Sequence, residues 1–134
     1  MTLQQLPGSL VSASWLYEQL DSPRLVIFDA SWHMQATGRS GLEEWRVERI
    51  KNAVFFDFDQ AVCDSDSDLP HTMPTAEKFN HEVRKLGLNQ DSLVVVYDGL
   101  GMVTSPRAWW MLKAMGLANC AVLDGGLPAW KAAG

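Results

Sequence analysis

The sequence predicts an α/β domain with a mostly parallel central sheet flanked by helices on both faces. Short apolar runs rich in β-branched residues alternate with longer segments that carry apolar residues at helical spacing. Strands that alternate with helices in this way pair in parallel through right-handed crossovers. The run Leu93–Tyr97 is uncharged and free of glycine and proline, which indicates a strand buried on both faces. A chain of 134 residues is expected to form one domain, spanning residues 1–134.

Each predicted element rests on local signals. The strands are apolar runs bounded by turn-forming residues, and they are expected at Leu25–Ala30, Asn52–Phe56, Leu93–Tyr97 and in the run CAVLD that starts at Cys120. Helices are predicted by capping residues and by glycines that follow their last turn. They are expected after Ser12, roughly from Ser40 to Glu48, from Thr75 to Leu86, from an N-cap at Ser105 to Gly116, and in LPAWKAA.

The carboxyl ends of the predicted strands direct attention to one edge of the sheet, because open α/β sheets place their ligands there. An aspartate ends each of the four apolar runs: Asp29, Asp57, Asp98 and Asp124. The segment between Asp57 and Pro74 is long and dominated by Asp, Ser and Pro, which is typical of a functional or mobile loop. We expect an apolar patch rimmed by polar groups beside this segment.

The most informative segment is YDGLGMVTSPR, residues 97–107, in which a strand leads through a glycine-containing loop into a helix. Such a loop can point backbone N–H groups inward, and the helix dipole adds positive potential, so an anion is favoured at its centre. An enzyme could hold a thiolate nucleophile there. This chain has Asp98 at the first loop position, and we favour the interpretation that Asp98 caps the turn over a role as a catalytic acid. Arg107 is expected to pair with a carboxylate such as Asp98, with substrate binding as the alternative.

Composition and charge exclude several classes of function. A net charge of −5 and a pI near 5.0, without any basic run, argue against nucleic-acid binding. The longest strongly apolar stretches are about five residues, too short to span a membrane. Cys63 and Cys120 follow no metal-ligand spacing, and the start of the chain does not look like a signal peptide, so reduced thiols in a cytoplasm are expected. His33 and His81 are expected at the surface, and Cys120 is expected to be buried and inert.

Several segments together resemble one enzyme family. These are VSASWLYEQL, VIFDASWH, GRSGLEEW, NAVFFDFDQ, LPHTMP, VVVYDG, SPRAWWMLKAMG and LDGGLPAWKAAG. Their order and spacing, from about Leu10 to Gly134, are similar to those of the first domain of mercaptopyruvate and thiosulfate sulfurtransferases, which carry two rhodanese domains. In that family the catalytic cysteine lies in the second domain, and the first has aspartate at the equivalent loop position. The resemblance implies that Asp98, Gly99, Gly101 and Arg107 form a vestigial active-site loop.

The resemblance also implies a reaction and its partners. A cysteine of the C-terminal rhodanese domain of the same chain would take sulfur from a small-molecule donor, 3-mercaptopyruvate or thiosulfate, as a persulfide. It would pass the sulfur to cyanide or to a thiol acceptor such as thioredoxin, without metal or organic cofactor. By residue-to-residue match, Asp59 and His71 would reach across the domain interface to assist that cysteine. The alternative is a loop-stabilising pair or two solvated side chains.

One departure from the family pattern lies before the second predicted strand. The family usually has His-Ile-Pro-Gly-Ala there, whereas this chain has Arg49-Ile50-Lys51-Asn52-Ala53, so the turn loses its proline and its glycine. A second hypothesis from another class stays open beside the enzyme: a stand-alone, inactive rhodanese-like module for binding or regulation. The two differ in whether a second domain with a cysteine-centred loop follows this one.

Overall fold

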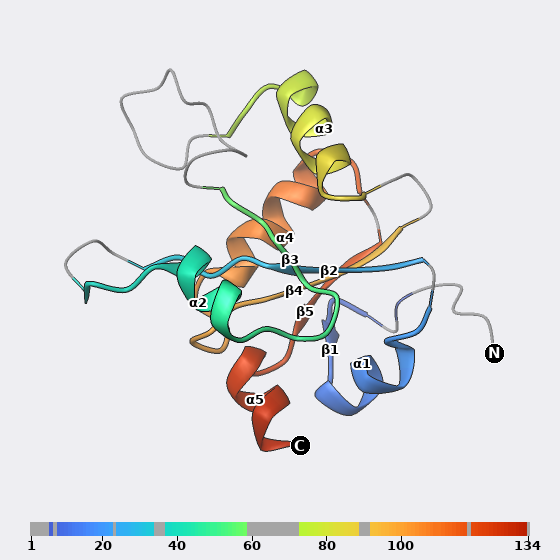
Figure 1. Cartoon of the computed structure of the whole chain (residues 1–134). Helices are drawn as coiled ribbons and strands as arrows, with labels where there is room; N and C mark the ends of the chain where they lie inside the picture. The colour runs from blue at the N-terminus through green and yellow to red at the C-terminus, as the bar shows by residue number, and fades with distance from the viewer. Residues whose placement is uncertain are drawn as a thin grey trace.

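The computed structural model describes residues 6, 8–22, 24–33, 37–58, 73–88, 92–117 and 119–133. Strands and helices alternate along these residues (Figure 1). The order is β1 (Leu10–Val11), α1 (Ala13–Gln19), β2 (Leu25–Asp29), α2 (Gly41–Val47), β3 (Val54–Phe55), α3 (Ala76–Lys85), β4 (Leu93–Tyr97), α4 (Ser105–Ala114), β5 (Cys120–Leu123) and α5 (Gly126–Ala132). In the described part of the chain, no helix has the length and apolar character needed to cross a membrane.

The strands form one sheet in the order β1-β5-β4-β2-β3, and all of its strand pairs are parallel. The predicted α/β class with a parallel sheet is therefore confirmed. Strand β1 was not predicted, because it contains only two residues at the sheet edge and Leu10 is half exposed. So short an edge strand leaves no periodic pattern in the sequence.

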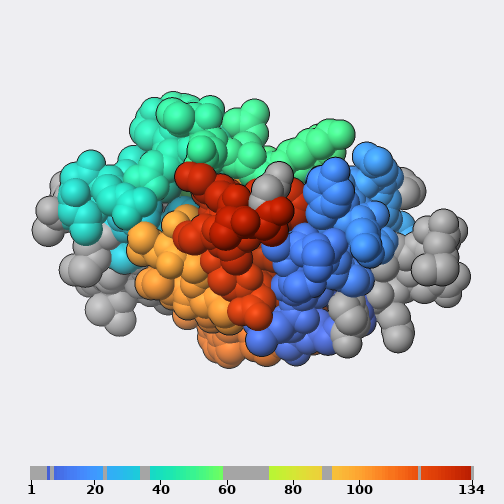
Figure 2. All heavy atoms as spheres, turned by 90° about the horizontal axis from the view of Figure 1, so that it is seen from below, coloured from blue at the N-terminus to red at the C-terminus, as the bar shows by residue number. Residues whose placement is uncertain are grey.

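Helices cover both faces of the sheet, as predicted. Figure 1 places α3 and α4 on one side and α1 and α5 on the other. Seen from the α5 side, α5 (red) lies between α1 (blue) and the orange stretch that follows β4 (Figure 2). Each face has its own buried cluster, one including Phe28, Val94, Val96, Met111 and Leu112, the other Leu16, Ile27, Val95, Tyr97 and Leu123. All five residues of β4 are buried; Val94 and Val96 lie in one cluster, and Val95 and Tyr97 in the other.

Local sequence signals set most helix starts. The side chains of Ser12, Ser40 and Thr75 each accept a hydrogen bond from the backbone N–H three residues later, which satisfies an N–H that has no partner inside the helix. Helix α4 differs, because its N-cap is Thr104 without a side-chain cap, one residue before the expected Ser105. The reason for this shift lies in the candidate site, where another side chain provides the cap.

The turn that departs from the family pattern is closed by a residue in the left-handed conformation. Asn52 has a φ of 68°, the left-handed conformation that favours glycine and that asparagine tolerates better than most residues. The Ala53 N–H donates to the Ile50 carbonyl oxygen at 2.9 Å, which closes the turn before β3. Asn52 therefore provides the left-handed residue of this turn without a glycine.

Candidate functional site

The carboxyl ends of β2, β3 and β4 meet at one edge of the sheet, and the polar side chains of the candidate site gather there. Register pairs Asp29 with Tyr97 on β4 and with Phe55 on β3, so the loops after these three strands begin side by side. Parallel pairing brings the strand ends together even though they are far apart in sequence. The loop after β4, residues 98–104, is the centre of this group.

The Asp98 carboxylate occupies the middle of that loop. Its Oδ1 accepts the N–H of Leu100 at 2.9 Å, and its Oδ2 accepts the N–H groups of Val103 and Thr104, both at 3.0 Å. The Ser105 N–H donates to Oδ2 at 2.7 Å, and the Asp98 side chain is buried. The carboxylate therefore caps both the turn and the start of α4, as the sequence interpretation favoured. It also explains why Thr104 needs no side-chain cap of its own.

The same loop is held by contacts that do not involve the carboxylate. The Gly99 N–H donates to Ser31 Oγ at 2.9 Å, and Thr104 Oγ1 donates to the Ala30 carbonyl at 2.7 Å. From α5, the Leu127 N–H donates to the Asp98 carbonyl at 3.0 Å. An isolated antiparallel bridge joins Asp98 and Gly101, and Gly101 has a φ of 121°, which a side chain would strain. The loop is therefore fixed from β2, from α5 and from within.

A second buried carboxyl lies behind the loop. Ser31 donates to Asp29 Oδ1 from its N–H at 2.9 Å and from its Oγ at 2.6 Å. Burial raises the pKa of the Asp29 carboxyl, while the Ser31 bonds and a hydrogen bond with Tyr97 act in the opposite direction. Burial also raises the pKa of the Tyr97 hydroxyl, which accepts the Ile50 N–H at 3.3 Å. Ser31 thus links Asp29 to the Gly99 amide.

Arg107 lies in the first turn of α4, and its guanidinium stands over the Trp110 ring at 5.0 Å from the centroid. Such cation–π contacts are stabilising at protein surfaces. Four hydrogen bonds to the Asp98 carboxylate come from backbone N–H groups. Arg107 therefore contributes to the site as part of the α4 surface beside the loop.

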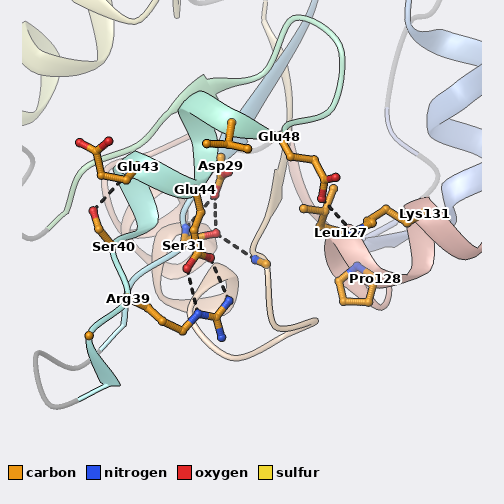
Figure 3. A pocket seen from close by; sticks show the side chains of 13 residues that line it. Asp29, Ser31, Arg39, Ser40, Glu43, Glu44, Glu48, Leu127, Pro128 and Lys131 are labelled. Carbon is orange, nitrogen blue, oxygen red and sulfur yellow. Dashed lines mark hydrogen bonds and ion pairs between the residues drawn. The ribbon is translucent and has the colours of Figure 1, made fainter.

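A pocket of about 860 Å³ opens beside the loop, between α2 and α5 (Figure 3). Asp29, Ser31 and Gly99 form part of its lining. Arg39 donates to the Glu44 carboxylate through Nε at 2.8 Å and Nη2 at 2.9 Å, and this pairing lowers the pKa of Glu44. The sequence analysis missed this pocket, although GRSGLEEW placed Arg39 and Glu44 five residues apart across a helix start.

His33 is a correction to the sequence analysis. We expected it at the surface, but its side chain is only 2% exposed and its Nε2 lies 3.2 Å from Glu44 Oε1. It lines a neighbouring pocket of about 540 Å³ together with Trp32, Asp57 and other residues. Packing against segments remote in the sequence buries this histidine, and no local pattern signals that. Among the described residues, no cluster of His, Cys, Asp or Glu could hold a metal ion.

Several predicted site residues lie outside the described residues. These are Asp59 and His71. Cys63 and most of the segment from Asp57 to Pro74, beside which the apolar patch was expected, also lie outside them. The described residues on either side of Asp57, Phe56 and Phe58, are both buried in the core. Cys120 is buried as predicted, and burial raises the pKa of its thiol to about 11, which makes it a poor nucleophile.

Exposed apolar side chains do occur on the loop after β4. Leu100, Met102 and Val103 are 45%, 41% and 64% exposed, and Trp110 of α4 is 48% exposed. Large apolar side chains grouped on one surface are typical of an interaction site. Three of these side chains belong to the loop whose polar centre is already satisfied by Asp98.

The protein-family model of the rhodanese-like domain matches residues 12–133 of this chain. A mitochondrial thiosulfate/3-mercaptopyruvate sulfurtransferase of Arabidopsis thaliana is 43% identical over 93% of this chain and 33% of its own length. The human 3-mercaptopyruvate sulfurtransferase is 40% identical over 97% of this chain and 46% of its own. The crystal structure of SseA from Escherichia coli, described as a 3-mercaptopyruvate sulfotransferase, superimposes with a TM-score of 0.87 at 39% identity, covering 93% of this chain and 48% of that one.

The chain thus spans between a third and just under half of the relatives it matches. Family model, sequence relatives and structural likeness agree with one another and with the parallel sheet and the loop after β4. The chain belongs to the rhodanese family, as a rhodanese-like domain similar to part of the 3-mercaptopyruvate sulfurtransferases.

Proposed function

We propose that this chain is the first, non-nucleophilic domain of a two-domain sulfurtransferase that moves sulfane sulfur from 3-mercaptopyruvate or thiosulfate. The observation that carries the proposal is the buried Asp98 carboxylate at the centre of the loop after β4. A carboxylate cannot hold a persulfide, so the sulfur-accepting cysteine must come from elsewhere. Relatives that are named for this activity are more than twice as long as the matched region.

The proposed reaction needs one cysteine thiolate, which a second rhodanese domain supplies. The thiolate attacks the sulfur of 3-mercaptopyruvate, the carbon–sulfur bond breaks, and the carbon is protonated to give pyruvate. With thiosulfate the sulfur–sulfur bond breaks and sulfite leaves with the electron pair. Either donor leaves a cysteine persulfide. Cyanide or an acceptor thiol, such as that of thioredoxin, then attacks the outer sulfur and releases the thiolate.

In this proposal the first domain assists through Asp59 and His71. Both come after β3 in the sequence, and β3 ends at the sheet edge where the candidate site lies. Phe56 and Phe58, which precede them in the sequence, are buried. A histidine of near-neutral pKa can shuttle the proton of a thiol, and a carboxylate can fix its tautomer. The exposed apolar side chains of the loop after β4, Leu100, Met102 and Val103, support contact with the second domain. We place the protein in the cytoplasm, where the acceptor thiols are kept reduced.

The first test measures thiocyanate formed from either donor in the presence of cyanide. The 134-residue chain should show no turnover, and a polypeptide that continues into a second rhodanese domain with a cysteine-centred loop should show it. Cys63→Ser serves as the control in both. Turnover by the 134-residue chain that Cys63→Ser abolishes would contradict the proposal and make Cys63 the nucleophile.

The second test separates the two assisting residues in the two-domain protein. His71→Ala should lower turnover with 3-mercaptopyruvate by about 10²–10⁴-fold, the usual contribution of general acid–base catalysis, without changing the melting temperature. Asp59→Asn should lower it less, because Asp59 acts through the histidine. A His71→Ala protein with unchanged turnover would show that the two residues only stabilise their loop.

A further inference from the structure

The loop after β4 has more hydrogen-bond donors than a turn requires. Four backbone N–H groups, those of Leu100, Val103, Thr104 and Ser105, converge on the two oxygens of one carboxylate. The hydroxyl of Ser105, whose N–H makes the shortest of these bonds, is fully buried and has no hydrogen-bond partner among the described residues. The site therefore holds a spare buried donor beside the four that are used.

The donors belong to a scaffold that does not depend on the carboxylate. Contacts from Ser31, Ala30 and Leu127 hold the loop backbone from outside. The ten-residue helix α4 begins at Ser105, so its dipole adds positive potential at the same point. Donors fixed in this way would still point inward if the Asp98 side chain were shortened.

We propose that the loop is a working anion-binding site in which the Asp98 carboxylate is a tethered ligand. Without that carboxylate, the site would take up a small free carboxylate such as formate, or stabilise a thiolate at position 98. In the native chain the tethered carboxylate fills the site at all times, because a ligand on the same chain has a high effective concentration. On the basis of the proposed function, this keeps the anionic sulfur donor out of the first domain and confines the chemistry to the second.

The first experiment removes the tethered ligand and offers a free one. The melting temperature of Asp98→Ala is measured in formate and in sodium chloride at the same ionic strength. Asp124→Ala is the matched control, because Asp124 follows the neighbouring strand β5 and is exposed. Formate at about a hundred times its dissociation constant should raise the melting temperature of Asp98→Ala by roughly 5–10 °C. It should leave Asp124→Ala and the native chain unchanged.

Two results would overturn the proposal. One is an equal effect of formate on Asp98→Ala and Asp124→Ala, because the effect would then be general. The other is an Asp98→Ala chain that stays unfolded even in formate, because a free anion would then fail to replace the tethered one.

The second experiment uses a thiol as its own probe. In Asp98→Cys the new thiol should have a pKa lowered by about two units or more from the ordinary value near 8.5, since N–H groups at a helix start stabilise a thiolate. The pKa is measured from the pH dependence of iodoacetamide alkylation, and peptide mass analysis separates the label at position 98 from label at the two native cysteines. An unshifted or raised value at that position would contradict the proposal.

The outcomes distinguish this proposal from the proposed function. Formate binding together with a lowered thiol pKa would support the anion site even if no two-domain protein showed sulfur transfer. Sulfur transfer by the two-domain protein without either signal would support the function and reject the anion site.

Discussion

Asp29 and Asp98 end neighbouring strands of one sheet and are both buried, at 3% and 1% exposure, yet their surroundings differ. Asp98 accepts four backbone N–H groups, which replace the water that its carboxylate lost on folding. Asp29 accepts one N–H and one hydroxyl from Ser31 and packs beside Tyr97, and burial raises the pKa of its carboxyl. Two aspartates of equal burial thus have different electrostatic roles.

The difference shows what a rhodanese loop provides. At the end of β2, Asp29 receives hydrogen bonds from Ser31 and Tyr97, but burial outweighs them and raises the pKa of its carboxyl. A strand that leads through a tight loop into a helix supplies N–H groups from the turn and from the helix start together, as at Asp98. The loop, and not the position at the sheet edge, makes the second site suitable for an anion.

The largest effect should come from the charge of Asp98. Asp98→Asn keeps the shape of the side chain but turns an amide group toward a backbone N–H, so buried donors lose their acceptor. We expect the free energy of unfolding to fall by about 4 kcal/mol, measured by urea denaturation. Asp124→Asn, at the end of β5, should change it by less than about 0.5 kcal/mol. Equal effects would mean that the four N–H contacts contribute little.

Gly126→Ala tests how closely α5 must approach the loop. Gly126 has a φ of 58°, and a Cβ there would overlap the carbonyl oxygens of Asp98 and Gly101. We expect a loss of about 3 kcal/mol in the free energy of unfolding, from backbone strain and displacement of the loop. Gly116→Ala, at a φ of 96° but with open space around it, gives the cost of strain alone. If the two losses are equal, contact between α5 and the loop is not what holds it.

Ser31→Ala tests the connection between the two aspartates. The variant removes the hydroxyl that donates to Asp29 and accepts the Gly99 N–H. We expect a loss of about 1–2 kcal/mol in the free energy of unfolding. Faster hydrogen exchange of the Gly99 amide should accompany it, while the Leu100 amide bound to Asp98 stays protected. Unchanged exchange at Gly99 would show that the loop does not need this connection.

Asp29→Asn should have a small effect that depends on pH. Because the folded pKa of Asp29 is raised above the ordinary value of 3.8, the folded protein binds the proton more tightly than the unfolded chain. The stability that protonated Asp29 contributes is thus fully present below pH 3.8 and is lost as the pH rises through the folded pKa. The stability of Asp29→Asn relative to the native chain should therefore increase over this range and then level off. Denaturation curves across the acidic range give the difference in the free energy of unfolding between Asp29→Asn and the native chain. If this difference does not change with pH, burial does not shift the pKa of Asp29.

Local sequence patterns are enough to predict the class of fold and the position of the candidate loop. The helix starts at Ser12, Ser40 and Thr75 depend on a side chain and an N–H three residues away, and β4 depends on a run of five apolar residues. Both partners of such an interaction lie within a few residues of each other, so a local pattern predicts it. The same holds for the interpretation that Asp98 caps its own turn.

The surroundings of that loop come from residues far away in the sequence, and no local pattern predicts them. The Gly99 N–H donates a hydrogen bond to the hydroxyl of Ser31, 68 residues away. The Thr104 hydroxyl donates to the carbonyl oxygen of Ala30, 74 residues away. The burial of His33, the short strand β1 and the pocket between α2 and α5 likewise require segments that are far apart in the chain to pack together. These features arise from packing, and a pattern of neighbouring residues contains no information about which distant backbone will lie against it.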